Sequence, residues 1–320
     1  MVNKGLLSKV LSGVLIGVCG FSLAPNIVNA KPAKGEKTLD YHKIKAETVV
    51  AKPKATVVKP ASLKDYVQIP PNELMVVDTT KGRIIVALAP KIAPIHVKRI
   101  TELTREKFYN GIVFHRVIDG FMDQTGDPTG TGTGGSSKPD IKGEFEFRRS
   151  GEMPFVKGKD EGANQFGWIG LMPITTQQDA VMDVTSDGKT KAWINHCPGI
   201  TSMARSEDPN SANSQFFFMR DKSSQLDRKY SAWGYVVSGL EVVKSIKLVN
   251  PEKSPPNAPG LDKMLKVTMM DDLPAKDQVK VFYAQSGTET FNKGLAAAMD
   301  KKGAIFGVCD FVPDVQIITN

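Results

Sequence analysis

One arginine stands out as a candidate for chemistry because of the residues around it. Arg116 lies in the run FHRVIDGFMDQ, and side chains two residues apart on an extended segment share a face. We therefore expect Arg116 to share its face with Phe114 and Ile118, which is unusual for an arginine that only meets solvent. Such an arginine either pairs with a carboxylate, here Asp119 or Asp123, or lines a site.

The sequence lacks the signatures of several other chemistries. It contains no G-x-S-x-G, no H-E-x-x-H and no G-x-x-x-x-G-K-[ST]. Residues 130–135 match G-x-G-x-x-G, but the SSKPD that follows favours a turn over the helix that a dinucleotide site requires. The four histidines are scattered and no C-x-x-C pair is present. We therefore expect neither a cofactor nor a metal ion.

Three blocks of this sequence resemble the cyclophilin family. They are residues 114–135, 202–217 and 226–234. The first is similar to the family's F-H-R-x-x-x-G-F-M-x-Q-x-G-D…G-T-G-G, the second to S-M-A…S-Q-F-F and the third to L-D…F-G-x-V. The blocks follow the family's order, and the resemblance covers about residues 74–249 and a closing strand near 264–270.

The resemblance implies a peptidyl-prolyl cis–trans isomerase that acts on proline-containing peptides and unfolded proteins, with Arg116 as its catalytic residue. The side chains implied to bind substrate are Phe121, Met122, Gln124, Gly132, Ala204, Arg205, Gln215, Phe217, Leu226 and Tyr230. Within this set the four apolar side chains at 121, 122, 217 and 226 would hold the proline ring. Arg205 and Tyr230 stand where many members have Asn and His, so contacts at these two positions would differ.

An arginine suits this reaction because rotation about an X–Pro bond needs no nucleophile. The barrier of about 18–20 kcal/mol comes from amide resonance, and the twisted prolyl nitrogen regains a lone pair that a guanidinium can meet. The alternative is a peptide-binding or chaperone module that keeps the same fold and performs little catalysis.

The pattern of elements predicts a mainly β protein. Residues 74–79 and 83–88 read as strands joined by a hairpin at 80–82, and Pro94 suits the first turn of a helix. A second short helix is expected near 239–246. Many short strands and two helices favour a closed antiparallel barrel, which has no exposed strand edges. The resemblance implies eight strands, capped by the two helices.

The N-terminal residues 1–30 have the layout of a secretory signal peptide: Lys4 and Lys9, an apolar run, and small residues up to Ala30. We expect cleavage after Ala30 and an exported, periplasmic protein. An uncleaved anchor is the alternative, and Cys19 raises a lipoprotein reading that the bulky Val18 argues against. Cleavage would lower the net charge from +8 to +6, since the two lysines are the only charged residues in this segment.

The rest of the chain divides into three expected regions: a basic Lys/Pro/Ala-rich tether at 31–72, a cyclophilin-like domain at 73–274 with an insertion at 147–198, and a C-terminal extension at 275–320. The tether could touch a membrane surface, but it lacks the aromatic residues of nucleic-acid binders. For the insertion, a small core of Trp168, Trp193 and the turn at residues 195–197 is favoured over a partner-binding surface. Cys197 and Cys309 either form a disulfide or stay free. The sequence indicates no oligomeric state.

Overall fold

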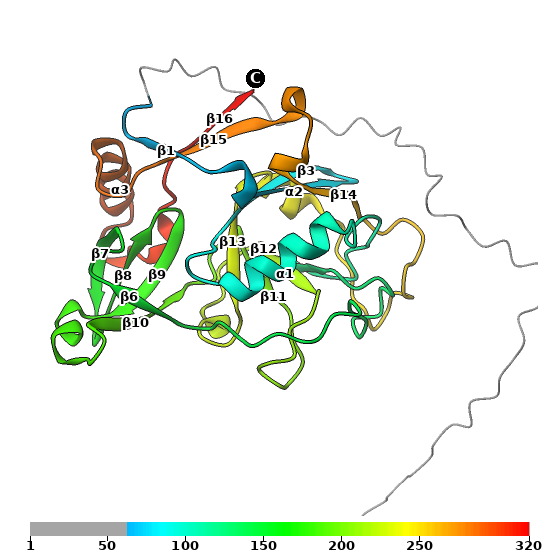
Figure 1. The fold of residues 1–320 in the computed structure, drawn as a ribbon, viewed down its shortest axis with the longest axis horizontal. Coiled ribbons are helices and arrows are strands. Elements are labelled where there is room, and N and C mark those ends of the chain that lie inside the picture. The colour runs from blue at the N-terminus through cyan, green and yellow to red at the C-terminus, as the bar shows by residue number, and fades with distance from the viewer. Residues whose placement is uncertain (1–62, 320) are drawn as a thin grey trace, which may run out of the picture. The chain divides into compact units, whose positions relative to one another are not determined.

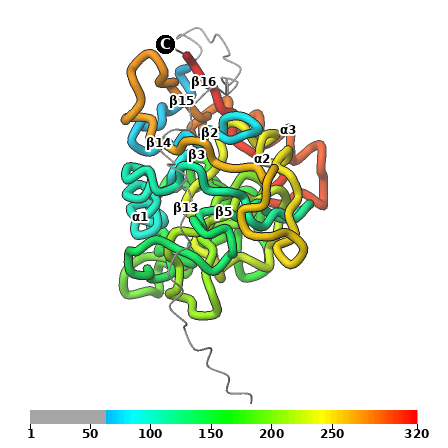
Figure 2. Tube along the Cα trace, turned by 90° about the vertical axis from the view of Figure 1, so that its right-hand side faces the viewer, coloured from blue at the N-terminus to red at the C-terminus, as the bar shows by residue number. Residues whose placement is uncertain are grey.

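A computed structural model describes residues 63–319, which form three antiparallel sheets (Figures 1 and 2). The expected signal peptide and residues 31–62 of the expected tether lie outside the described residues. The boundary at residue 72 is wrong, because Tyr66–Gln68 forms strand β1 and pairs with Ala284, Tyr283 and Phe282 of the C-terminal segment. Composition could not show this, since the partner strand comes more than 200 residues later in the chain.

The largest sheet contains eight strands in the order β14-β2-β3-β13-β11-β12-β5-β4. Their bounds are β2 Leu74–Thr79, β3 Gly82–Leu88, β4 Arg116–Ile118, β5 Met122–Thr125, β11 Ile200–Met203, β12 Phe216–Met219, β13 Ala232–Ser238 and β14 Met264–Met269. The expected hairpin is confirmed, with Thr79 opposite Gly82. Every pairing in this sheet is antiparallel.

The expected closed barrel is confirmed only in part, because the eight strands form a curled sheet with β14 and β4 at its edges. Between these edges the structure has an isolated bridge from Val113 to Lys263 and a backbone hydrogen bond from Phe114 to Asp262, in place of a continuous ladder. Regular pairing of β4 begins only at Arg116 and covers three residues. The strand is too short to extend along β14.

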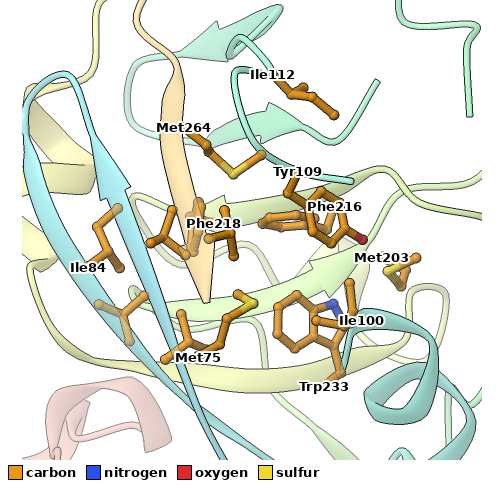
Figure 3. Packing of buried hydrophobic residues seen from close by; sticks show 14 of the residues in the cluster. Met75, Ile84, Ile100, Tyr109, Ile112, Met203, Phe216, Phe218, Trp233 and Met264 are labelled. Atoms are coloured by element: carbon orange, nitrogen blue, oxygen red, sulfur yellow. The ribbon is translucent and has the colours of Figure 1, made fainter. Parts of the chain in front are cut away.

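The interior of the curled sheet holds the main apolar core (Figure 3). Met75 and Val77 of β2 point into it, and the alternate residues of the same strand belong to a second cluster on the outer face, as the two-residue period of a strand requires. Helices α1 (Pro94–Arg105) and α2 (Leu240–Ser245) cover the interior through Ile100 and Val243, which are fully buried. The two expected helices are therefore present.

The insertion is a five-stranded sheet in the order β6-β10-β9-β8-β7. Its strands are β6 Phe147–Ser150, β7 Phe155–Glu161, β8 Asn164–Ile169, β9 Met172–Gln177 and β10 Lys189–Ile194. Met172, Ile174 and Ile194 lie in one buried cluster with the outer-face residues Val76 and Ile85 of the eight-stranded sheet. This contact explains why β2 and β3 are buried on both faces.

The C-terminal segment contributes β15 (Val279–Ala284), β16 (Val315–Thr319) and helix α3 (Glu289–Lys302). Strands β1, β15 and β16 form the third sheet, and α3 lies beside the insertion (Figure 1). Trp168 does lie in a small separate core, but it packs against Phe291 and Phe311 of this segment. Trp193 is outside that core, with its ring 5.0 Å from the guanidinium carbon of Arg228.

Candidate functional site

Three neighbouring strands bring the arginine and its expected partners onto one face of the large sheet. Arg116 of β4 lies directly opposite Gln124 of β5, and Gln124 lies directly opposite Phe217 of β12. Directly opposed residues of an antiparallel sheet project to the same side, so these three side chains form a row on the outer face. Met122 extends the row, since it pairs with Ile118 of β4.

Phe114 does not share this face, contrary to the expectation from simple alternation. It is fully buried in the interior core together with Val117, three residues further on. Residues 114 and 115 lie outside the strand, between the isolated bridge at Val113 and the start of β4. The alternation that starts at Arg116 is therefore offset from the residues before it.

Arg116 is held by a neutral partner. Its Nη1 donates to Oε1 of Gln124 at 3.2 Å and lies 3.9 Å from the sulfur of Met122. Among the described residues, no carboxylate lies within ion-pair distance of this guanidinium. The ion-pair alternative is excluded by geometry, because both candidate carboxylates contact Arg220 at 3.4 and 3.0 Å.

A relay of amide groups continues from the arginine to the glycine-rich loop. Nε2 of Gln124 donates to Oε1 of Gln215 at 2.9 Å. Nε2 of Gln215 in turn donates to the carbonyl oxygens of Gly132 and Gly134, at 2.9 and 2.7 Å. Each amide therefore has one orientation that satisfies both of its neighbours, and the loop, the relay and Arg116 are held in one arrangement.

Asp127 shapes the loop that ends this relay. Its buried carboxylate accepts hydrogen bonds from the backbone N–H groups of Thr129, Gly132 and Gly134. Burial alone would raise the pKa of Asp127, but the hydrogen bonds from Thr129 and the two glycines outweigh it and hold the pKa below its ordinary value. The sequence offered a signal for this role, because the Gly-Asp pair belongs to the first resembling block.

An apolar cluster, proposed below to form the proline pocket, lies beside the arginine. Met122, Phe217 and Leu226 are 1, 4 and 8 % exposed and belong to one buried cluster, against which the partly exposed Phe121 and Tyr230 pack. The ring of Phe217 meets that of Tyr230 edge-on at 5.8 Å. The ring of Phe121 lies 6.0 Å from the guanidinium carbon of Arg116. Apolar walls and a cationic donor therefore meet at one place.

The remaining expected residues lie at the edge of this cluster. Ala204 packs against the same cluster, and its backbone N–H donates to the carbonyl of Gln215 at 2.9 Å. The guanidinium carbon of Arg205 lies 4.8 Å from the ring centre of Tyr230 and 5.6 Å from that of Phe145. Each of the eleven expected residues therefore contacts another member of the set.

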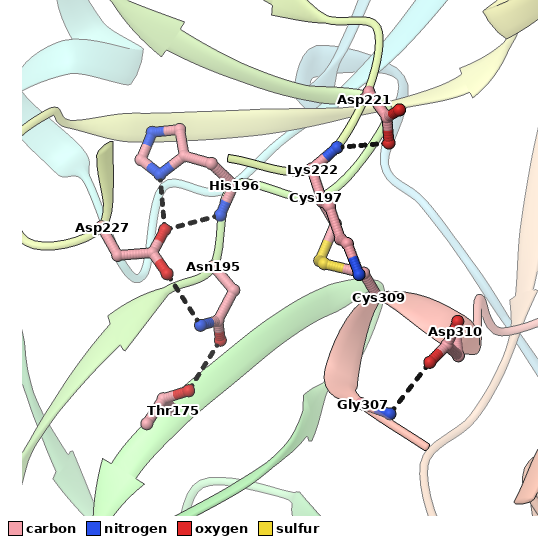
Figure 4. The surroundings of a disulfide bond; sticks show 10 residues. All are labelled: Thr175, Asn195, His196, Cys197, Asp221, Lys222, Asp227, Gly307, Cys309 and Asp310. Atoms are coloured by element: carbon pink, nitrogen blue, oxygen red, sulfur yellow. Dashed lines mark hydrogen bonds and ion pairs between the residues drawn. A yellow bond between two sulfur atoms is a disulfide. The ribbon is translucent and has the colours of Figure 1, made fainter. Parts of the chain in front are cut away.

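A buried histidine behind the pocket was not anticipated. His196 shares a hydrogen bond of 2.8 Å with the carboxylate of Asp227 through Nδ1 (Figure 4). Its Nε2 shares another of 2.8 Å with Ser202, and its ring stacks on Phe217 at 6.3 Å. Ser202 is fully buried, so it cannot meet a substrate as a nucleophile. The three residues instead support the back of the pocket. They are distant in sequence from Arg116, and only the turn 195–197 drew attention to them.

Two further properties of residues 63–319 bear on the site. No helix among them is long and apolar enough to cross a membrane. In the same range, no three His, Cys, Asp or Glu side chains gather in a way that could hold a metal ion.

Comparison with known proteins gives a consistent result. Residues 74–269 match the family model for cyclophilin type peptidyl-prolyl cis-trans isomerases. A probable peptidyl-prolyl cis-trans isomerase of Brucella suis is 33 % identical over 213 residues, which are 63 % of this chain and 85 % of the relative. Peptidyl-prolyl cis-trans isomerase-like 1 of Aspergillus oryzae is 34 % identical over 172 residues, 54 % of this chain and 80 % of the relative.

A solved structure is similar over more of the chain than the family model. The crystal structure of the cyclophilin AquaCyp293 from Hirschia baltica superposes with a TM-score of 0.73 and 34 % identity, and it covers 81 % of this chain and 96 % of its own. Because residues 74–269 are a smaller share of the chain than this 81 %, the similarity in structure also includes residues outside the range that the family model matches. This chain belongs to the cyclophilin-type peptidyl-prolyl cis–trans isomerases, a family of enzymes.

Proposed function

We propose that this enzyme accelerates rotation about X–Pro bonds in peptides and unfolded proteins, with Arg116 as the donor to the prolyl nitrogen. The observation that carries the proposal is the position of the guanidinium. It is held at 3.2 Å by the neutral Gln124, no carboxylate of residues 63–319 forms an ion pair with it, and it lies beside an apolar cluster. A cation held by a neutral partner keeps donors available for a substrate.

Arg116 would act through selective binding of the twisted state. In the planar ground state the prolyl nitrogen shares its electron pair with the carbonyl, so it accepts hydrogen bonds poorly. Rotation breaks this sharing and returns the pair to nitrogen. A guanidinium already in place then stabilises the twisted bond more than either planar isomer, which lowers the barrier without a covalent step.

The pocket and the relay would hold the substrate around this bond. Met122, Phe217 and Leu226 offer buried apolar surface for the proline ring, which leaves the preceding carbonyl free to turn. The peptide backbone on either side would lie along Gln215 and Ala204. Arg205 and Tyr230 form the rim, where stacked guanidinium and phenol groups favour contact with flat or apolar side chains.

An isomerisation assay on Arg116→Ala tests the proposal. A loss of about 100-fold or more in kcat/KM is expected, the usual cost of removing one transition-state donor. The variant should still bind a proline-containing peptide, because the apolar pocket remains. Arg148→Ala is the matched control, since that arginine lies in the insertion and pairs with Asp187. Equal rates for wild type and Arg116→Ala would favour the alternative of a non-catalytic peptide-binding module.

We also propose that the protein is exported to the periplasm after cleavage behind Ala30. The layout of residues 1–30 supports this, and so does the disulfide between Cys197 and Cys309, because such bonds persist mainly in oxidising compartments. The basic tether would then be free to contact anionic lipid at the membrane surface. Mass spectrometry of the mature N-terminus tests the cleavage, and a protein that keeps Met1 would contradict it.

A further inference from the structure

A groove lies next to the proposed proline pocket. This groove has a volume of about 700 Å³ and runs between β7 of the insertion, the turn that contains Ser224–Leu226, and residues 304–310 of the C-terminal segment. Its walls come from three stretches of the chain, within residues 159–175, 195–227 and 304–310. Lys159 Nζ joins two of them by donating to the carbonyl of Ala304 at 3.1 Å.

The groove offers apolar surface to a ligand. Phe166 and Phe306 line it but are almost fully buried, so most of the apolar surface that a ligand could cover belongs to Ile305 at the rim. Ile305 lies between Ala304 and Phe306 in the same wall, and the residue is 82 % exposed. An isolated aliphatic side chain in water needs no explanation, but one at the rim of an aromatic-lined groove adds to a surface that a ligand can cover.

The polar lining indicates which ligand class fits. Lys159 and Lys222 contribute positive charge and Asp160, Glu161, Asp227 and Asp310 negative charge, so acidic side chains outnumber basic ones. Nucleic acids and other polyanions are therefore disfavoured. The side-chain amide of Gln225 offers both a donor and an acceptor, which is what the backbone of an extended polypeptide requires.

The groove and the proline pocket share a wall. Gln225 lines the groove, and the next residue, Leu226, belongs to the apolar pocket. His196 also lines the groove, while its ring stacks on Phe217 of the pocket. A chain that leaves the proline pocket over this wall enters the groove directly.

The shared wall is also covalently fixed. The Cys197–Cys309 disulfide joins the turn after His196 to the far wall of the groove, as Figure 4 shows. In the same wall, the carboxylate of Asp310 accepts a hydrogen bond from the backbone N–H of Gly307 at 2.9 Å. A groove with its walls held in this way loses little conformational freedom when a ligand binds, which favours affinity.

We propose that this groove binds the stretch of an unfolded polypeptide that adjoins the proline in the catalytic pocket. The inference rests on the proposed function, because it assigns the groove to the same substrate. Short peptides fill only the proline pocket, whereas longer chains contact both recesses. The insertion and the C-terminal segment thus adapt the enzyme to unfolded proteins.

The test compares a tetrapeptide with a peptide of about 16 residues around the same Ala-Pro bond, long enough to span both recesses. Ile305→Glu should raise KM for the long peptide about tenfold, because it replaces apolar contact with a charge, and leave kcat/KM for the tetrapeptide unchanged. Val184→Glu is the matched control, since Val184 is 84 % exposed and lines none of this groove. It should change neither value.

Three outcomes would overturn the groove assignment: an unchanged KM for the long peptide, equal losses on both peptides, or the same loss in Val184→Glu. Fluorescence anisotropy with the labelled long peptide measures Kd without turnover. If the wild type bound this peptide but isomerised neither substrate, the proposed function would fail. The effect of Ile305→Glu on Kd would then still decide whether the groove binds polypeptide.

Discussion

The disulfide allows a prediction whose magnitude follows from the structure. Cys197 and Cys309 are 112 residues apart, and the closed loop contains β11 to β14, β15 and α3. A cross-link of this span lowers the entropy of the unfolded chain enough to stabilise the fold by about 4.7 kcal/mol at 25 °C. For a domain of this size, 1 kcal/mol moves Tm by about 2–4 °C. Reduction should therefore lower Tm by about 10–20 °C.

Thermal unfolding followed by circular dichroism, with and without a thiol reductant, measures this difference. Reduction is preferable to mutation for the main comparison, because Cys197 is buried and its replacement would also change packing. The control is the double variant Cys197→Ala/Cys309→Ala, which should not respond to reductant. A shift of less than about 2 °C in the wild type would refute the reasoning, since the unfolded chain would then gain little freedom on reduction.

Two other predictions concern the relay and the loop. Gln124→Leu should lower kcat/KM for a tetrapeptide by about tenfold, because Arg116 loses its only hydrogen-bonded amide partner among the described residues. A rate equal to that of the wild type would show that the amide does not position the guanidinium. Asp127 should add an acid-sensitive contribution to stability. Its folded pKa lies below the ordinary value of 3.8, so the unfolded state binds the proton more readily, and stability is present above that pH and lost as the pH falls through the folded pKa. Chemical denaturation between pH 6 and pH 3 should show a smaller loss of stability for Asp127→Asn than for the wild type, and equal losses would contradict this.

The sequence predicted the local elements well where short-range signals were strong. The β2–β3 hairpin, the start of α1 at Pro94 and the short helix α2 lie where the residue pattern indicated. The five strands of the insertion were not predicted individually. Their burial depends on the outer face of the large sheet and on the C-terminal segment, and neither neighbour is visible in the local pattern.

The residues of the candidate site also fall into two groups: those that the sequence identified and those that only the folded structure brings together. The residues of the first resembling block, with Arg116 and Gln124, could be named from the sequence because their spacing within one stretch carries the signal. The support from His196 and Asp227 could not, because a hydrogen bond between residues 31 positions apart depends on how the turns pack. The ion-pair alternative for Arg116 failed for a similar reason, since Arg220 competes for both carboxylates.

The sequence by itself identified the family to which the chain belongs and predicted which residues carry the chemistry, because both depend on residue types in a set order. The tertiary structure alone decided what surrounds them: the curled sheet, the Cys197–Cys309 link, and the groove that the insertion and the C-terminal segment form beside the pocket. These features rest on contacts between residues more than 100 positions apart. Such contacts form only when the whole chain has folded, so no short stretch of sequence encodes them.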